Sequence, residues 1–552
     1  MVTGGSTPPF ESSDAGNAPR GSWVAAGQRF CGGTLKGLAT KIGYLERLGV
    51  SAIWISPVFK QLASRETYHG YGIQDFLDID PRFGTRDDLR ALVDTAHAHG
   101  IRVILDIILN HTGDVFEYDA DRYETRRDDG TTFLDPRWDS REYRVAVFRD
   151  ASGAATLPLA TIDLVAHPTA HPHGAIWPRE LQSPSTFTRK GRISNWDFDR
   201  EFLDGDFFDL KDVRLGDGSL DDYRPSDALK TLAAVYKYWI AFADVDGFRL
   251  DTVKHMDLGA SRYFGSVIHE FAQSIGKDNF YLIAEITGGR QRAFQTLETT
   301  GLDAALGVDD IPDKVEYLVK GFRNPEDYFS LFRNSLLVQK ESHIWFRNTV
   351  VTMFDDHDQV RKGENKARFC ADAGADRLAL AVLALNATTL GIPCIYYGTE
   401  QAFDGRGRSD QFLRETMFGG EYGAFQSRGR HFFREDGALY KALSQVLRVR
   451  RQKLALRRGR QYLREISGNG HEFGFPRLVG DVIRSVVPWS RILDETELVL
   501  AINTDADSPR TAWVTIDASL HRTGDHLQCV YSTDAADIGR DVTVEARNGK
   551  AV

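Results

Sequence analysis

Four short segments of the sequence place acidic side chains directly after runs of apolar residues. They are Asp106–His111, Gly247–His255, Ala284–Ile286 and Phe354–Asp358. In a barrel of parallel strands that alternate with helices, side chains at the carboxyl ends of the strands form the active site. The pattern therefore predicts that acidic groups from distant parts of the chain meet at one rim of such a barrel.

The chemistry of these segments centres on Asp251. Arg249 lies two residues earlier, so both side chains project from one face of an extended strand, and the cation favours an ionised carboxylate that can act as a nucleophile. Glu285 ends the apolar run 281–284, where partial desolvation favours the protonated form that a general acid needs. Two carboxyl groups in opposite environments are the minimum equipment for cleaving a glycosidic bond. Asp358 adds a third carboxyl group, which can stabilise positive charge on a sugar ring.

Each of these residues also has a structural interpretation. A single Asp or Glu at a strand end is commonly a helix cap or a solvated loop residue. His255 alone could be a buried core histidine, and Asp106, inside an apolar strand, is interpreted as a buried structural hydrogen-bonding residue. His111 and His357 could donate hydrogen bonds to sugar hydroxyls. Only the joint pattern on successive strands points to catalysis.

The elements that must position these residues alternate between strand and helix. Strands are predicted over 51–58, 101–109, 247–251, 280–286, 350–354 and 393–397. Helices are predicted over 34–48, 85–99, 226–243 and 261–275. In the second helix Thr85 and Asp88 form a capping box and Gly100 is the stop signal. Strands apolar on both faces, alternating with helices, predict an α/β fold with a (β/α)8 barrel.

Two regions depart from this alternation. Residues 113–205 are rich in Asp, Arg, Pro and Trp and too long for a structureless connection, which predicts an inserted subdomain after strand 3. After about residue 467, short β-rich runs predict a C-terminal antiparallel β-domain. We therefore expect a catalytic barrel built from 1–112 and 206–466, an inserted subdomain at 113–205 and a β-domain at 467–552.

The composition is that of an ordinary soluble globular protein. Of its 552 residues, 42% are hydrophobic and 26% are charged. The formal net charge of −10 argues against a nucleic-acid or anionic-membrane partner. Residues 378–397 carry no charged side chain, but Asn, Thr, Gly and Pro interrupt them, so we expect a buried helix and a buried strand rather than a membrane span. No signal peptide is visible, which favours a cytoplasmic location.

The cysteines and one group of histidines could suggest a metal site, but neither group is interpreted as a set of metal ligands. Cys31, Cys370, Cys394 and Cys529 are far apart, which predicts reduced thiols rather than a disulfide framework or a zinc site. The stretch containing His167, His171 and His173 is rich in proline and predicts an exposed loop.

The four acidic segments closely resemble the signature sequences of the α-amylase family of retaining glycoside hydrolases. Asp106–His111 resembles the first signature, Gly247–His255 the second, Glu285 the third and His357–Asp358 the fourth. Supporting matches lie at 70–71, 75, 78–85, 208–210 and 391–398, and the resemblance extends from about Gly32 to Glu400. It implies that Asp251 is the nucleophile, Glu285 the acid/base and Asp358 the transition-state stabiliser.

The resemblance also implies a set of ligand contacts. The implied substrate-binding residues are Tyr71, Asp75, His111, Arg249, Lys254, His255 and His357. The adjacent Lys254 and His255 favour an α-1,4-glucan chain over a small disaccharide. The chemistry needs no cofactor, but a structural calcium ion is implied, held by Asn110, Asp209 and the backbone carbonyl of His255.

Three features depart from the family pattern. Asp356 stands where Asn or Ser commonly precedes the histidine of the fourth signature. The fifth signature reads Phe-Phe-Asp-Leu-Lys at 207–211, so a lysine ends it. Residues 1–30 offer only a weak first strand around 22–26, which leaves either an irregular strand or missing upstream sequence, and truncation at both ends is a further expectation.

Together these features predict a retaining α-glycoside hydrolase that cleaves α-1,4-glucosidic bonds in starch-like glucans or malto-oligosaccharides. The alternatives are an α-glucosidase or an α-glucan transglycosylase of the same family. A non-catalytic carbohydrate-binding protein is the remote alternative, and the three carboxylates argue against it. Oligomeric state, endo or exo action and exact linkage stay open.

Overall fold

The computed structural model describes residues 33–65, 67–119, 125–126, 132–133, 135–156, 175–308, 310–332, 347–358, 361–415, 417 and 433–552. The chain packs as two compact units. The first contains the described residues up to Gly43 together with Ser51–Gly288 and Arg292–Ala305, and the second contains Tyr44–Val50, Gly289–Gln291 and Leu306–Val552.

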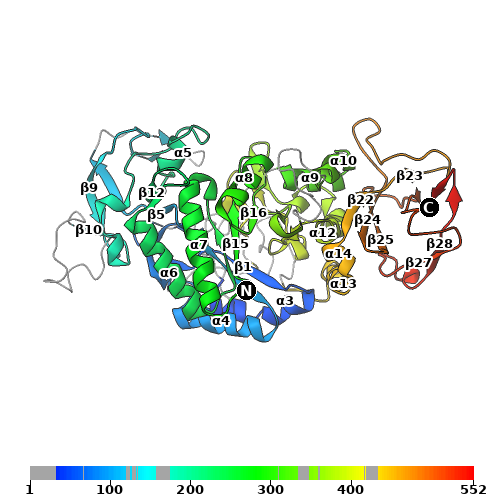
Figure 1. The fold of residues 1–552 in the computed structure, drawn as a ribbon, viewed down its shortest axis with the longest axis horizontal. Coiled ribbons are helices and arrows are strands. Elements are labelled where there is room, and N and C mark those ends of the chain that lie inside the picture. The colour runs from blue at the N-terminus through cyan, green and yellow to red at the C-terminus, as the bar shows by residue number, and fades with distance from the viewer. Residues whose placement is uncertain are drawn as a thin grey trace. The chain divides into compact units, whose positions relative to one another are not determined.

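A five-stranded sheet is the centre of the first unit (Figure 1). Its strands, in spatial order, are β1 (Ala52–Ile55), β4 (Arg102–Ile107), β14 (Gly247–Leu250), β15 (Tyr281–Glu285) and β16 (Ala304–Leu306). The register shows parallel pairing of β1 with β4, β4 with β14 and β14 with β15. All residues of β14 are buried, as a parallel strand covered on both faces requires.

Amphipathic helices accompany this sheet. They are α2 (Leu35–Ala39), α4 (Arg86–Ala98), α6 (Asp227–Ala243), α7 (Leu258–Ser274) and α8 (Arg290–Thr300). The predicted capping box of α4 is present, because Thr85 and Asp88 exchange both side-chain-to-backbone hydrogen bonds, and Ser226 caps α6. Helix α4 packs on both α2 and α6, and α6 packs on α7.

Buried aromatic side chains of α6 fasten this helix to the strand ends near the predicted site. Tyr236 donates its hydroxyl hydrogen to the backbone oxygen of Ile108 at 2.6 Å, and Trp239 donates from Nε1 to the backbone oxygen of Phe76 at 2.8 Å. Both rings are fully buried, so their polar atoms need these partners. The chain directly after β4 is thereby held in a fixed position.

Antiparallel strands occupy the segment in which the insertion was predicted. Strands β6 (Phe116–Asp119), β9 (Arg144–Arg149) and β10 (Ala155–Thr156) form one sheet in the order β10-β9-β6. Strand β5 (His111–Gly113) pairs with β11 (Leu210–Asp212), so the two ends of the segment lie side by side. The remaining short elements of the first unit are β2 (Phe59–Gln61), β3 (Ile73–Ile79), β7 (Thr125–Arg126), β8 (Thr132–Phe133), β12 (Gly216–Asp217), β13 (Arg224–Pro225) and α5 (Glu201–Asp204), with 3-10 turns at Arg179–Leu181, Pro184–Thr186 and Val253–His255.

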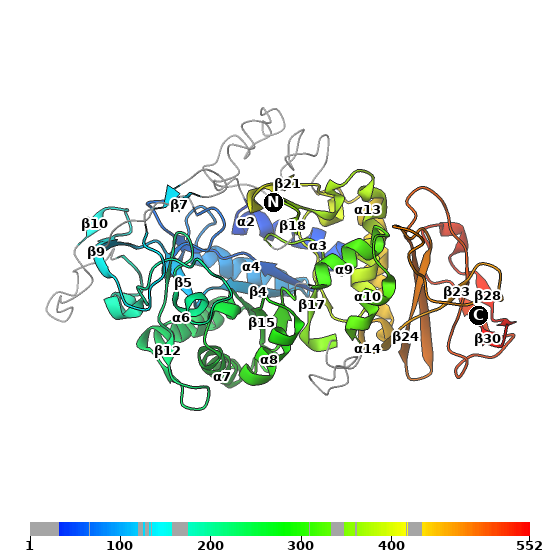
Figure 2. The same ribbon diagram turned by 90° about the horizontal axis from the view of Figure 1, so that it is seen from above.

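The second unit contains two further parallel strands, β17 (Val351–Thr352) and β20 (Ile392–Pro393). Its helices are α3 (Ile42–Leu48), α9 (Asp310–Val319), α10 (Pro325–Phe329), α12 (Ala379–Thr388), α13 (Ala438–Gln452) and α14 (Leu454–Arg458). Helix α9 packs on α10 (Figure 2), and α12 packs on α13. A small antiparallel sheet contains β18 (Arg361–Lys362), β19 (Asn365–Ala367) and β21 (Arg406–Gly407).

Antiparallel pairing dominates the last part of the chain. Strands β22 (Arg460–Leu463), β24 (Val486–Leu493) and β25 (Thr496–Asn503) form one sheet, with β24 in the middle. Shorter pairs join β23 (Ile466–Ser467) to β26 (Trp513–Val514), β27 (His526–Gln528) to β28 (Asp541–Thr543) and β29 (Ala546–Arg547) to β30 (Lys550–Ala551). The remaining 3-10 turns lie at Ser330–Phe332, Phe369–Ala371, Ala375–Leu378, Thr399–Gln401, Asp410–Phe412 and Ala535–Asp537.

Several sequence-based expectations need adjustment. The helix predicted over 34–48 is two helices, α2 and α3, with Thr40 capping the first. The buried strand predicted over 393–397 is the two-residue β20, which is only half-buried. The helix expected before it is present as α12, and among the described helices none is long and apolar enough to cross a membrane. The three described cysteines, Cys370, Cys394 and Cys529, are free thiols as predicted.

Candidate active site

The second and third acidic segments lie on neighbouring parallel strands. The register pairs Arg249 of β14 with Asp106 of β4, and it pairs Leu250 of β14 with Ala284 of β15. Asp251 and Glu285 are the next residues in this register. Since adjacent strands are about 4.8 Å apart, the two carboxyl groups emerge beside each other.

Arg249 connects the acidic groups of this edge. Its side chain is 1% exposed. The Nη1 atom donates to Asp251 Oδ1 at 2.6 Å and to Asp106 Oδ1 at 2.9 Å, while Nη2 lies 2.8 Å from Glu285 Oε2. The expected contact between Arg249 and Asp251 is therefore present, and one cation favours the ionised form of three carboxyl groups.

Glu285 has neighbours that the sequence did not indicate. The residue is 8% exposed, in line with the expected desolvation. However, Glu285 Oε2 also accepts a hydrogen bond from the backbone N–H of Thr252 at 3.0 Å, in addition to its contact with Arg249. Both donors stabilise the carboxylate, so the argument from desolvation alone was incomplete. Thr252 presents its N–H from a left-handed conformation, with φ of 51°.

Asp106 is the buried hydrogen-bonding residue that the sequence predicted, and it organises the site. Its Oδ2 accepts hydrogen bonds from Trp54 Nε1 at 3.0 Å and from the Tyr71 hydroxyl at 3.1 Å. The Arg249 guanidinium lies 5.1 Å from the centre of the Trp54 ring. Trp54 was not predicted as a site residue, because an aromatic residue in an apolar strand carries no signal beyond packing.

His111 is buried against the proposed nucleophile. Its Nε2 lies 3.8 Å from Asp251 Oδ2, and within the described part of the chain neither ring nitrogen has a hydrogen-bond partner. Burial lowers the pKa of His111 to about 4, so the ring is neutral near pH 7. A neutral imidazole with one N–H can donate to a sugar hydroxyl without adding charge.

Lys254 and His255 lie next to a group of aromatic side chains. Lys254 Nζ is 2.9 Å from Asp197 Oδ1, and His255 Nδ1 is 2.7 Å from the backbone oxygen of Phe202. Burial lowers the pKa of His255 to about 4. The rings of Trp196 and Phe207 pack edge-on against His255, with centroids 5.6 and 4.8 Å away.

The fourth segment belongs to the second unit and has charged partners of its own. His357 Nδ1 lies 2.8 Å from Asp356 Oδ1, so the residue that departs from the family pattern orients the imidazole. The His357 ring is also 6.4 Å from the Tyr396 ring. Asp358 Oδ1 is 2.5 Å from Nζ of Lys366, a residue that the sequence did not single out.

Asp75 lies in the hairpin that β2 and β3 form. It lies on β3, and its carboxylate accepts a hydrogen bond from the backbone N–H of Leu77 at 2.8 Å. Burial raises the pKa of Asp75 to about 6. The register places it opposite Lys60 of β2.

The residues implied for calcium fit the ion in chemical type. Asn110 is 2% exposed, and its amide nitrogen has no hydrogen-bond partner among the described residues; because the two amide atoms are easily exchanged, this position can also present oxygen. Asp209 offers a half-buried carboxylate, although Arg65 Nη1 lies 4.0 Å from it. The described residues contain no group of three or more His, Cys, Asp or Glu side chains arranged to hold a metal ion. The histidines at 167, 171 and 173 lie outside the described residues.

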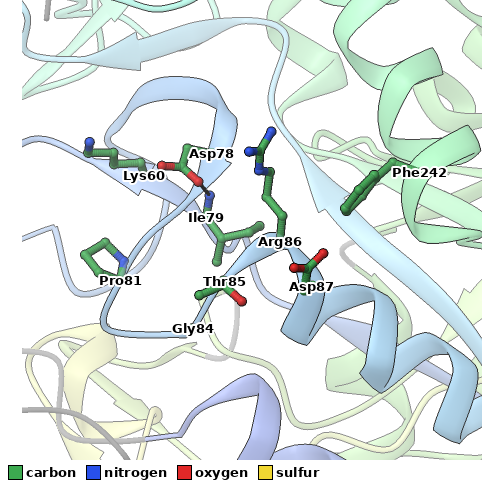
Figure 3. A pocket seen from close by; sticks show the side chains of 9 residues that line it. All are labelled: Lys60, Asp78, Ile79, Pro81, Gly84, Thr85, Arg86, Asp87 and Phe242. Carbon is green, nitrogen blue, oxygen red and sulfur yellow. Dashed lines mark hydrogen bonds between the residues drawn. The ribbon is translucent and has the colours of Figure 1, made fainter.

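A pocket of about 540 Å³ lies elsewhere in the first unit, at the start of α4 (Figure 3). Lys60, Asp78, Arg86, Asp87 and Phe242 are among its lining side chains, and none of the predicted site residues is. Its position beside the helix start separates it from the carboxyl ends of β14 and β15. This pocket is therefore not part of the candidate active site.

The chain belongs to the α-amylase family. The family profile of the α-amylase catalytic domain matches residues 7–421, which includes all four acidic segments. This profile match begins at residue 7, whereas the signature motifs identified in the sequence begin only at about Gly32. Members of this family are glycoside hydrolases.

Relatives agree with this membership. An α-amylase of Streptomyces lividans is 28% identical over 94% of this chain and 56% of its own length. A cyclomaltodextrin glucanotransferase of Klebsiella oxytoca is 26% identical over 71% of this chain and 57% of its own length. The chain thus spans little more than half the length of these relatives.

A solved structure supports the fold. The Anoxybacillus α-amylase superimposes with a TM-score of 0.63 at 21% identity, covering 97% of this chain and 92% of the other. This likeness and the parallel strand order support the predicted (β/α)8 barrel architecture.

Proposed function

We propose that this protein is a retaining α-glycoside hydrolase acting on α-1,4-glucosidic bonds in starch-like glucans or malto-oligosaccharides. The observation that carries the proposal is the contact of one buried guanidinium, that of Arg249, with both Asp251 and Glu285. Retention requires two carboxyl groups about 5–5.5 Å apart, and neighbouring ends of two parallel strands are compatible with that spacing.

The proposed reaction has two steps. In the first, Glu285 gives its proton to the glycosidic oxygen while Asp251 attacks the anomeric carbon, so the bond to the leaving sugar breaks and an ester to Asp251 forms. In the second, a water molecule attacks the same carbon, Glu285 takes the water proton and Asp251 leaves. Asp358 would stabilise positive charge on the ring in both transition states.

The contacts of Asp251, His111 and Tyr71 suit this scheme, whereas the two donors on Glu285 favour its carboxylate, the form that acts as base in the second step. The cation of Arg249 keeps Asp251 ionised and therefore nucleophilic. The neutral ring of His111 lies beside Asp251 and can donate to a sugar hydroxyl. Tyr71 is fixed by Asp106 and offers a ring on which a pyranose can stack.

Replacing Asp251 tests the proposal. We expect Asp251→Asn to abolish turnover of malto-oligosaccharides while circular dichroism stays that of the wild type, because an amide is not a nucleophile. The anomeric configuration of the first product, followed by NMR, should equal that of the substrate. Full activity in Asp251→Asn, or an inverted product, would contradict the mechanism.

Transglycosylation is the second candidate, and the aromatic group beside Lys254 favours it. Phe208 is 44% exposed and packs on Trp196, which in turn contacts His255. Exposed aromatic faces bind sugar rings, so a second glucan could compete with water for the glycosyl enzyme. A relative named cyclomaltodextrin glucanotransferase adds weight to this candidate. Timed product analysis with labelled maltose as acceptor separates the two, since only transfer puts label into longer chains.

We further propose that a calcium ion stabilises the protein through Asn110, Asp209 and the backbone carbonyl of His255. Oxygen donors of this kind suit calcium, which would act structurally and take no part in bond cleavage. A chelator should then lower the melting temperature, and added calcium should restore it. An unchanged melting temperature, with no calcium detected by elemental analysis, would contradict this proposal.

A further inference from the structure

The fourth acidic segment has a cationic neighbour that the family signatures do not include. Lys366 Nζ lies 2.5 Å from Asp358 Oδ1. The lysine side chain is 11% exposed, whereas that of Asp358 is 43% exposed. The ammonium is therefore held inside the protein, and the carboxylate it contacts is accessible to a ligand.

The backbone around Lys366 fixes its position. Lys366 is the central residue of β19, which lies between β18 and β21. It pairs with Arg361 on one side and with Gly407 on the other. The connection from β18 to β19 is the two-residue turn Gly363-Glu364, in which Gly363 has φ of 65°, as the tightest hairpins require at their first turn position. A lysine in the middle of a three-stranded sheet has little backbone freedom.

Charge compensation explains why the pair forms. A largely buried ammonium is unfavourable unless an anion or hydrogen-bond acceptor contacts it. Within the described residues, Asp358 is the ion-pair partner found for Lys366. The neighbouring titratable groups of the segment, Asp356 and His357, contact each other.

We propose that Lys366 is a positioning residue for Asp358, holding its carboxylate in one orientation while the other side of the group faces the sugar. This inference rests on the proposed function, in which Asp358 stabilises the transition state. The ammonium itself carries the wrong sign to stabilise a positively charged sugar ring. Its contribution is therefore orientation, and it acts through Asp358.

Orientation and merely structural support predict different kinetics. If Lys366 orients a group that acts in the transition state, Lys366→Met should lower kcat while KM changes little. Misplacing a reacting group by about 1 Å costs up to about 100-fold in rate, so we expect a decrease of roughly 10- to 100-fold.

The experiment compares Lys366→Met with Lys366→Arg and with a control. Arginine keeps the positive charge at similar reach, and we expect it to recover most of the wild-type kcat. Lys230→Met is the matched control, because Lys230 forms an exposed ion pair with Asp227 on α6 and should leave kcat unchanged. The assay follows release of a chromophore from a nitrophenyl malto-oligosaccharide between pH 4 and 9, and circular dichroism monitors folding.

The outcomes separate the two proposals. If the wild type is active and Lys366→Met keeps the wild-type kcat, only the role of Lys366 is overturned. A wild type without activity on any α-glucan would overturn the proposed function, and the role of Lys366 with it. Should Lys366→Met not fold, Lys366→Arg decides: a kcat near that of the wild type supports the proposal, and a loss of kcat equal to that of Asp358→Asn contradicts it.

Discussion

Replacing Asp106 by Asn probes the buried network beneath the candidate site. The wild-type carboxylate is fully buried and accepts hydrogen bonds from Trp54, Tyr71 and Arg249. Asparagine keeps the size of the side chain but removes its charge. Its NH2 group is a hydrogen-bond donor and would face Trp54, Tyr71 or Arg249, which also donate hydrogen bonds. We therefore expect Asp106→Asn to destabilise the first unit and to lower kcat by displacing Tyr71 and Arg249.

The contacts set the size of this effect. Breaking a buried ion pair by removing one partner costs about 3–5 kcal/mol. Arg249 keeps its contacts with Asp251 and Glu285, so its charge stays compensated and the lower end, about 3 kcal/mol, applies. For a unit of about 300 residues, that corresponds to a melting temperature lower by about 5 °C.

Differential scanning calorimetry of wild type and variant at pH 7 measures the shift. Asp221→Asn is the control, because the Asp221 side chain is 92% exposed and 3.9 Å from Arg262; a surface pair contributes about 0–1 kcal/mol. An Asp106→Asn protein that melts within 2 °C of the wild type would show that the network does not stabilise the fold, and the reasoning would fail.

Two further substitutions test local features of the first unit. Gly70 has φ of 88°, and a Cβ there would lie 2.5 Å from the backbone oxygen of Pro57. Gly100 also has a positive φ, of 70°, but a Cβ there would meet nothing within 4 Å. Gly70→Ala should therefore lower the melting temperature more than Gly100→Ala does. Equal shifts in the two variants would refute the steric argument. His269 has a pKa above its usual value, because the hydrogen bond with Asp303 outweighs burial; its stabilisation is then full below about pH 6.5 and is lost as the pH rises through the raised pKa. His269→Gln should consequently lower the melting temperature at pH 5.5 and have little effect at pH 9, and a loss of the same size at both would contradict this.

Elements with local end signals could be predicted from the sequence. Helix α4 begins at its capping box and ends before Gly100, as expected. The helix predicted over 34–48 was wrong in one respect, because its halves have different partners: α2 packs on α4, whereas Tyr44 of α3 donates to Glu400 and stacks on Tyr440. A continuous apolar pattern contains no information on which surface each half will meet.

The same limit applies to the site. The contact of Arg249 with Asp251 follows from their spacing on one strand, so the sequence could predict it. The hydrogen bond of Trp54 to Asp106 joins strands 52 positions apart, and the pairing of Lys366 with Asp358 depends on a hairpin after the signature. Both require the register of neighbouring strands, which residue types alone do not give.

The buried ammonium of Lys211 has a consequence for protein engineering. It lies on β11 and contacts Asp114 and Asp135, each at 2.8 Å, both from the segment between β5 and β11. The ammonium of Lys211, on the strand that follows this segment, thus holds the segment in place through two ion pairs. A chimera that exchanges the segment with a relative's counterpart must carry a matching acid for Lys211, or replace the lysine as well. A chimera without the matching acid would leave the Lys211 ammonium buried with no anionic partner from the segment. We expect such a chimera to misfold rather than to show altered specificity.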